Sequence, residues 1–236
     1  MKAILMAAGM GTRISDKTNQ PKCLLDIGGV ALVEHTVQLL LKNKIDVILC
    51  LGYKGDMIRE TLKEYPVSYY ENPFYEVTNS IASLWFARDV MSCGEDILFM
   101  NADVFWQQDL LDVLLEDDRD VVLLADVRRR LTGDYFFQVE HEELRAYGKE
   151  LVEEQRSSEY VGIAKIKSSF LPIMKERLMS LVKNGEYCLW WENTLYTMIE
   201  ERPIYVKDVE GRYWSEIDVI ADYENIVSYV KKHPLQ

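Results

Sequence analysis

Apolar runs of strand length alternate with amphipathic segments of helical period along the first half of the chain. Lys2–Ala7 is a continuous apolar run, which predicts a buried strand followed by the loop Ala8–Gln20. Ala31–Lys42 carries its apolar residues at helical spacing instead. The other strands expected are Val47–Leu51, Val67–Tyr70, Asp96–Met100 and Val121–Asp126; the other helices are one capped by Asp56 and ending near Glu64, Ser80–Met91 and Gln108–Leu115.

This alternation predicts an α/β fold, with a parallel sheet and helices on both of its faces. Ligands bind such sheets beyond the carboxyl ends of the strands. The loop Ala8–Gln20, Gly52-Tyr53 and Asn101–Asp103 are therefore expected on one rim of the sheet.

The second half of the chain has shorter elements, and we interpret it as a small lid on the same sheet. The whole of 1–236 is then one domain, with halves 1–126 and 127–236. The expected strands are Tyr135–Glu140, Leu144–Tyr147, Tyr160–Ile166, Ile204–Val209 and Tyr213–Ile217, and the expected helices are Ser168–Lys183, Glu192–Glu201 and Ala221–Lys231.

Composition and charge exclude several classes of protein. Of the 236 residues 48% are hydrophobic, enough for a core without disulfides or structural metals. No apolar run approaches the roughly 20 residues of a membrane helix. A net charge of −12 argues against a nucleic-acid binder, which needs a basic face, and against binding to an anionic membrane.

Cysteine and histidine spacing gives no metal site. The four cysteines form no CxxC pair and are expected to be buried, reduced thiols of a cytoplasmic protein. The three histidines show no ligand spacing and are expected at the surface. They are His35, His141 and His233.

The strongest chemical signal follows the first strand. The sequence reads A-A-G-M-G-T-R at Ala7–Arg13 and Q-P-K-C-L at Gln20–Leu24. Small residues let backbone N–H groups approach a phosphate or base closely, while Arg13 and Lys22 supply positive charge for phosphates. The alternative is an ordinary strand-to-helix turn, since a dinucleotide fingerprint would have a third glycine and a P-loop would have G-K-[ST]. The arginine and the P-K pair together favour a functional loop.

These motifs resemble those of nucleotidyltransferases that activate sugar 1-phosphates and small phospho-alcohols, whose opening sequence is A-A-G-x-G-[ST]-R followed by P-K-x-L. The resemblance extends along essentially the whole chain, through Gly52-Tyr53, Glu71–Pro73, Asn101–Asp103 and Glu216–Asp218. It implies a Rossmann-like mixed, mostly parallel sheet. It also implies in-line attack on the α-phosphorus of an NTP, with pyrophosphate leaving. The two halves would bind nucleotide and acceptor respectively.

Two aspartates at strand ends are candidate metal ligands. Asp103 closes an apolar strand, where an unpaired carboxylate is costly unless it holds a cation, and Asp218 closes another. On one rim they can share a Mg²⁺ that bridges the substrate phosphates. The resemblance assigns both as metal ligands, whereas on their own they can equally be strand-end caps.

The segment Glu71–Trp85 narrows the subfamily. Its N-P-x-Y…T-N-S-x-x-S-L form resembles cytidylyltransferases for phosphocholine and related phospho- or phosphonate substrates. Asn79 and Ser83 lie at a helix start, where they can contact a base or acceptor or simply cap the helix. With them, the nucleotide is expected to contact the loop residues Ala7, Ala8, Gly9 and Gly11.

Aromatic residues with a carboxylate suggest how a cationic acceptor is bound. Trp190, Trp191 and Glu192 lie where phosphocholine cytidylyltransferases carry an aromatic–acid group, and Tyr135 lies near another aromatic position of theirs. Aromatic faces and a carboxylate bind quaternary ammonium, although a primary amine would suit Glu192 equally. The alternative is that the two tryptophans are core anchors.

The favoured function is therefore Mg²⁺-dependent transfer of a cytidylyl group from CTP to a phosphocholine-like acceptor. The expected partners are a nucleoside triphosphate and a small phosphorylated acceptor. The alternatives are a sugar-1-phosphate nucleotidyltransferase using UTP, dTTP or GTP, and a binding module of this fold without catalysis.

Overall fold

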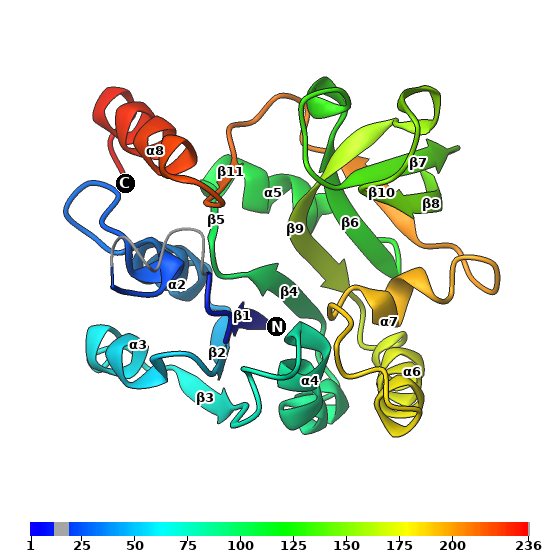
Figure 1. Cartoon of the computed structure of the whole chain (residues 1–236), viewed down its shortest axis with the longest axis horizontal. Helices are drawn as coiled ribbons and strands as arrows, with labels where there is room; N and C mark the ends of the chain where they lie inside the picture. The colour runs from blue at the N-terminus through cyan, green and yellow to red at the C-terminus, as the bar shows by residue number, and fades with distance from the viewer. Residues whose placement is uncertain (12–18, 236) are drawn as a thin grey trace.

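The strands of the first and second halves join one mixed sheet, shown in the computed structural model of Figure 1, which describes residues 1–11 and 19–235. In this described part the main sheet has the order β3-β2-β1-β4-β9-β6-β10-β8-β7, and only β8 and β9 run against the other strands. Its strands are β1 (Lys2–Ala7), β2 (Asp46–Leu51), β3 (Ser68–Glu71), β4 (Ile97–Asn101), β6 (Val121–Asp126), β7 (Phe136–Glu140), β8 (Glu143–Gly148), β9 (Ser158–Ile166) and β10 (Tyr205–Asp208), while β5 (Val104–Phe105) pairs with β11 (Ser215–Glu216).

Helices cover both faces of this sheet because neighbouring residues of its strands face opposite ways. Ala3 and Leu5 of β1 pack in one core cluster with α2, α3 and α5, whereas Ile4 and Met6 pack in another with α4, α6 and α7. The predicted α/β class, with a mostly parallel mixed sheet and helices on both faces, is confirmed. The helices are α2 (Leu32–Lys42), α3 (Gly55–Thr61), α4 (Ser80–Phe86), α5 (Gln108–Glu116), α6 (Leu171–Lys183), α7 (Asn193–Tyr196) and α8 (Ile220–Lys232), with 3₁₀ turns η1 (Lys22–Leu24), η2 (Arg88–Ser92), η3 (Val127–Arg129) and η4 (Glu153–Gln155).

Strand β9 joins the two halves of the chain. All nine of its residues are buried, and it pairs with β4 on one side and β6 on the other. Its first residues also pair with β7, so that β9, β6, β10, β8 and β7 form a closed ring of ladders. The second half of the chain therefore extends the main sheet itself and closes it at one end (Figure 1).

Three predicted helices differ in the structure. The helix expected over Ser80–Met91 is α helical only to Phe86, after which η2 continues the chain as a tighter turn. The helix expected over Glu192–Glu201 is helical only over Asn193–Tyr196. The hydroxyl of Thr197 there bonds the Asn193 carbonyl, and such side-chain bonds compete with a regular helix. Asp56 lies in the first turn of α3 rather than at its cap, which is Lys54.

Burial corrects two further expectations. His35 is buried: its ring stacks on Phe105 at 5.4 Å, and a ring nitrogen lies 2.9 Å from the Trp106 carbonyl oxygen. Cys23 and Cys50 are buried as expected, whereas Cys93 and Cys188 are exposed. No helix in the described ranges is long and apolar enough to cross a membrane.

Candidate active site

Two aspartates from opposite halves of the chain meet where β5 pairs with β11. Asp103 precedes β5, and its carbonyl accepts the backbone N–H of Ile217 at 2.9 Å. Asp218 follows β11, and Asp222 in the first turn of α8 accepts its backbone N–H at 2.9 Å. The side chain of Asp222 also accepts the N–H of Val219 at 2.8 Å, so the start of α8 holds Asp218 in place.

Lys22 lies between these two carboxylates. Its Nζ is 2.7 Å from Asp218 Oδ1 and 3.5 Å from Asp103 Oδ2, and only 12% of its side chain is exposed. Burial acts to lower the pKa of Lys22, but the nearby carboxylates outweigh it and raise that pKa. A Cβ at Gly11 would lie 2.8 Å from Lys22 Cγ, and Gly11 has φ +55°. The motif glycine therefore makes room for the lysine.

The same two carboxylates suit a divalent cation. Both reach one ammonium group, and carboxylate oxygens are the ligands that Mg²⁺ prefers. A third carboxylate, Glu216, lies nearby; burial, and then the charges of Asp103 and Asp218, raise its pKa well above the ordinary value. Among the described residues no group of three or more His, Cys, Asp or Glu side chains is arranged to hold a metal. Asp103 and Asp218 are therefore the residues that could hold a Mg²⁺ ion here.

A cavity of about 200 Å³ opens beside the end of β1, and we call it the β1 cavity. Four of the predicted nucleotide-binding residues line it. Ala7 instead packs in the core, and Gly11 lies beneath Lys22, so neither belongs to the lining. The lining comprises Met6, Ala8, Gly9, Asn72, Tyr75, Thr78, Asn79, Ser80, Ser83, Asn101, Asp103, Trp190 and Glu216.

A second cavity, of about 240 Å³, adjoins the first and shares Ser80, Asn101, Trp190 and Glu216 with it. We call it the aromatic cavity. It brings together three of the predicted acceptor-binding residues and Asp218. The lining comprises Ser80, Asn101, Asp134, Tyr135, Lys149, Glu159, Tyr160, Gly162, Trp190, Glu192, Tyr196, Glu216 and Asp218.

The rings of this cavity contact one another around Tyr135. Trp190 meets it edge-on, with ring centroids 5.3 Å apart, and Tyr196 stacks on it at 6.0 Å. Trp190 is 41% exposed, which leaves part of its ring available to a ligand. The buried hydroxyl of Tyr196 has no hydrogen-bond partner among the described residues, while that of Tyr160 lies beside the Glu192 carboxyl group. The cavity therefore offers aromatic faces together with an unused hydroxyl.

Glu192 supplies a buried carboxylate to the same cavity. Its Oε1 accepts a hydrogen bond from Asn101 Nδ2 at 3.3 Å, and in the described part of the chain no cation pairs with it. Burial raises the pKa of Glu192 to about 7, although hydrogen bonds from a backbone N–H, from Asn101 and from Tyr160 oppose the rise. A cationic ligand beside it would favour the ionised form.

Trp191 does not line either cavity, and the expectation that it contacts the acceptor is corrected. Its side chain is completely buried and stacks on Phe99 with ring centroids 5.4 Å apart. Its indole N–H donates to Asn101 Oδ1 at 2.9 Å. Trp191 thus fixes Asn101, which in turn lines both cavities.

Several residues that line the two cavities were not predicted from the sequence. Asn101 and Glu216 stand inside quoted motifs, so their proximity to Asp103 and Asp218 was a usable signal. Tyr160 and Tyr196 gave no signal, since each resembles an ordinary core aromatic. Arg13, predicted as a catalytic cation, lies outside the described residues.

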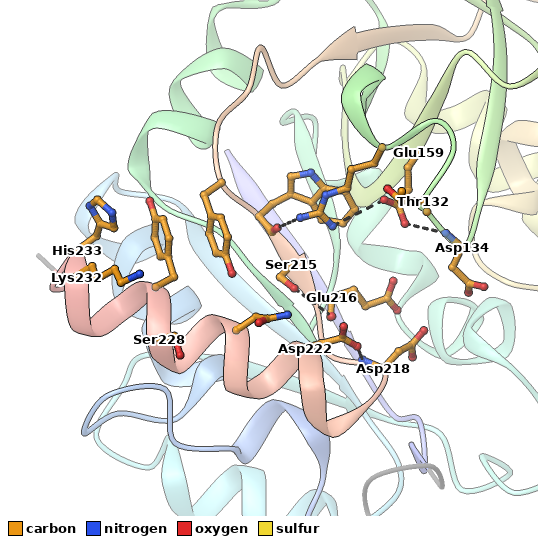
Figure 2. A pocket seen from close by; sticks show the side chains of 16 residues that line it. Thr132, Asp134, Glu159, Ser215, Glu216, Asp218, Asp222, Ser228, Lys232 and His233 are labelled. Carbon is orange, nitrogen blue, oxygen red and sulfur yellow. Dashed lines mark hydrogen bonds and ion pairs between the residues drawn. The ribbon is translucent and has the colours of Figure 1, made fainter.

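A larger groove of about 830 Å³ runs from the aromatic cavity along α8 (Figure 2). The carboxylates of Asp134, Glu216 and Asp218 gather at one end of the view, while Lys232 and His233 lie at the other, where α8 ends. The groove is therefore acidic where it joins the site.

Two adjoining cavities beside one lysine–carboxylate cluster can hold two substrates side by side, as a group-transfer enzyme requires. Residues 3–202 match the MobA-like NTP transferase domain, so the chain belongs to that family and is a nucleotidyltransferase.

Individual relatives cover nearly the whole chain. It is 26% identical over 238 residues to a choline-phosphate cytidylyltransferase of Streptococcus pneumoniae, covering 98% of this chain and 99% of that one. It is 24% identical to a CTP:phosphoglutamine cytidylyltransferase of Campylobacter jejuni, covering 95% and 98%. Among solved structures, a CTP:phosphocholine cytidylyltransferase from Streptococcus pneumoniae matches with a TM-score of 0.79 and 22% identity over 97% of this chain and 98% of that one.

Proposed function

We propose that the protein transfers a cytidylyl group from CTP to a small phosphorylated amino-alcohol of the phosphocholine type, giving a CDP-linked product and pyrophosphate. The aromatic cavity carries the acceptor part of this proposal. Among the described residues only Lys149 is a basic member of its lining, and Lys149 forms an ion pair with Asp134, which leaves Glu192 to be paired by the ammonium group of a ligand. Aromatic faces with a carboxylate attract an ammonium group. The full-length similarity to cytidylyltransferases supports CTP as the donor.

The positions of the cavities support a direction of transfer. The triphosphate would extend from a base in the β1 cavity toward Asp103 and Lys22, and the acceptor phosphate would extend from the aromatic cavity toward Asp218. Since an acceptor phosphate is already anionic at neutral pH, the chain needs no side-chain nucleophile. Its contribution is to position the two substrates and to stabilise charge.

Each charged group then has a distinct role. A Mg²⁺ ion held by Asp103 and Asp218 would neutralise phosphate charge when bound. Lys22, already beside both carboxylates, would exchange them for the oxygens of the transferring phosphoryl group. Arg13, from the resemblance, would steady the leaving pyrophosphate.

A panel of nucleotides and acceptors tests this function. Pyrophosphate release would be measured for CTP, UTP, dTTP and GTP, each with phosphocholine, aminoethyl phosphate and glucose 1-phosphate. We expect CTP with a cationic acceptor to exceed every other pair by at least about tenfold in kcat/KM, the effect of one or two buried polar or cation–π contacts. A preference for UTP or dTTP with glucose 1-phosphate would establish the sugar-nucleotide alternative. No turnover with any pair would favour a binding module, against which the assembled Lys22–Asp103–Asp218 cluster argues.

A further inference from the structure

Asn72, at the back of the β1 cavity, has an amide whose orientation is fixed by the backbone. It is 1% exposed, and its Oδ1 lies 2.9 Å from the backbone nitrogen of Phe74. A backbone N–H can only donate, so the atom facing it must be the amide oxygen. The Nδ2 group consequently faces the two hydroxyls on the other side, those of Thr78 and Ser83, each at 3.0 Å.

This orientation determines where both hydroxyl hydrogens point. Each hydroxyl accepts one hydrogen of the Asn72 amide, so its own hydrogen must go elsewhere. Thr78 donates to the Phe74 carbonyl at 2.8 Å. Ser83 has no acceptor for its hydrogen among the described residues, and it lines the β1 cavity. Ser83 therefore has its hydrogen available to donate to whatever occupies the cavity, and an occupant without an acceptor there would leave that hydrogen unpaired.

We infer that Asn72 is a positioning residue that sets Ser83 as a hydrogen-bond donor to the nucleobase, and so favours cytosine. The inference rests on the proposed use of this cavity for a nucleotide. Cytosine has an acceptor at N3 that takes the Ser83 hydrogen, whereas the N3–H of uracil can only bond the remaining lone pair of Ser83 and leaves the Ser83 hydrogen without an acceptor. Leaving a buried polar group unpaired is the usual basis of strong discrimination between close analogues.

The near-isosteric substitution Asn72→Asp tests this assignment. An ionised carboxylate still accepts from Phe74, but it also takes the hydrogen of Ser83, whose lone pairs then face the cavity. We expect the ratio of kcat/KM for CTP to that for UTP to fall about tenfold, with the acceptor KM unchanged. In the Ser83→Ala background, Asn72→Asp should have no further effect on this ratio, because no hydroxyl remains to be turned. If Asn72 had a purely structural role, Asn72→Asp would lower kcat/KM for CTP and for UTP by the same factor, with or without the Ser83 hydroxyl.

Thr78→Ala is the matched control, since it removes the other hydroxyl bonded to the same amide. The hydroxyl hydrogen of Thr78 already bonds the Phe74 carbonyl oxygen. This variant should therefore lose thermal stability and leave the ratio of kcat/KM for CTP to that for UTP unchanged. If Asn72→Asp does not fold, Ser83→Ala alone decides, and an unchanged base ratio in that variant overturns the inference. The effect of Asn72→Asp on the nucleotide preference, compared with and without the Ser83 hydroxyl, is the coupling between positions 72 and 83. It is measured with whichever two triphosphates the wild type uses. A wild type that prefers UTP would thus overturn the cytidylyl proposal, while a persisting coupling would retain Asn72 as the positioning residue.

Discussion

At the scale of single residues, the buried carboxyl group of Glu192 makes the stability of the fold depend on pH. The residue is 5% exposed, and burial raises the pKa of its carboxyl group to about 7 from an ordinary value of 4.5. Between these values the folded chain holds a proton that the unfolded chain has released. The contribution of Glu192 to the free energy of unfolding is therefore most favourable below pH 4.5, and this advantage is lost as the pH rises through about 7.

Glu192→Gln should remove this loss. Relative to wild type, the variant should gain up to roughly 3 kcal/mol in free energy of unfolding between pH 4.5 and pH 8, since a change of one in pKa corresponds to about 1.4 kcal/mol. Urea denaturation at both pH values measures this gain. Glu154→Gln, at an exposed position of η4, should show none. An equal response of the two variants would contradict the assignment of the buried proton.

The same variant should weaken use of a cationic acceptor. Wild-type kcat/KM for aminoethyl phosphate should rise with pH through about 7 as Glu192 ionises, beyond any change due to the substrate phosphate. Glu192→Gln should lack that rise and be at least about tenfold lower at pH 8. Parallel pH profiles for the two proteins would remove Glu192 from the acceptor site.

At the scale of elements, β9 shapes the site through a glycine. Gly162 has φ +87°, and a Cβ there would lie 3.1 Å from Asn101 Nδ2 and 3.1 Å from Val104 Cγ2. Asn101 links Trp191 to Glu192 by its two amide atoms. Because Gly162 has no side chain, β9 leaves room for Asn101, which lines both cavities.

Gly162→Ala should therefore impair both stability and transfer. Its control is Gly94→Ala, which has a similar φ of +76° but open space around the new Cβ. Each should lose roughly 1–3 kcal/mol in stability from backbone strain. Only Gly162→Ala should also lower kcat/KM, by about tenfold, because it displaces Asn101. Equal activity of the two variants in the pyrophosphate assay would show that Asn101 tolerates the shift.

The pattern of apolar residues along the sequence predicts single strands better than it predicts how strands pair or which residues are buried. The strand Val121–Asp126 was predicted to the residue, because it is a continuous apolar run buried on both faces. The closed ring of β9, β6, β10, β8 and β7 could not be foreseen, since which strands pair is set by contacts distant in sequence. His35 and Trp191 were misjudged for the same reason: burial of a single polar or aromatic residue depends on its tertiary neighbours.

At the scale of the whole molecule, the charged centre of the site contains a cation of the chain itself. Lys22 forms ion pairs with both Asp103 and Asp218, and the described core clusters are apolar. We therefore expect activity to depend on a divalent metal ion and the stability of the fold not to depend on it.

Removal of divalent ions tests that separation. Treatment with EDTA should nearly abolish pyrophosphate release and change Tm by less than about 2 °C. Asp103→Asn should give a similar loss of activity that excess Mg²⁺ does not fully restore. Full activity in EDTA would eliminate the metal from the proposal, and a large fall in Tm would mean that an ion is part of the fold.

The pairing of β5 with β11 also has a consequence for how the protein is made. Lys22 and Asp218 are 196 positions apart, and a ribosome adding about 5–20 residues per second needs roughly 10–40 s to pass from one to the other. Throughout that interval the growing chain carries Lys22, and later Asp103, without the strand that brings Asp218 to them. A ribosome-bound or prematurely terminated chain should therefore be unable to consume nucleoside triphosphate, and activity arises only when translation has passed β11.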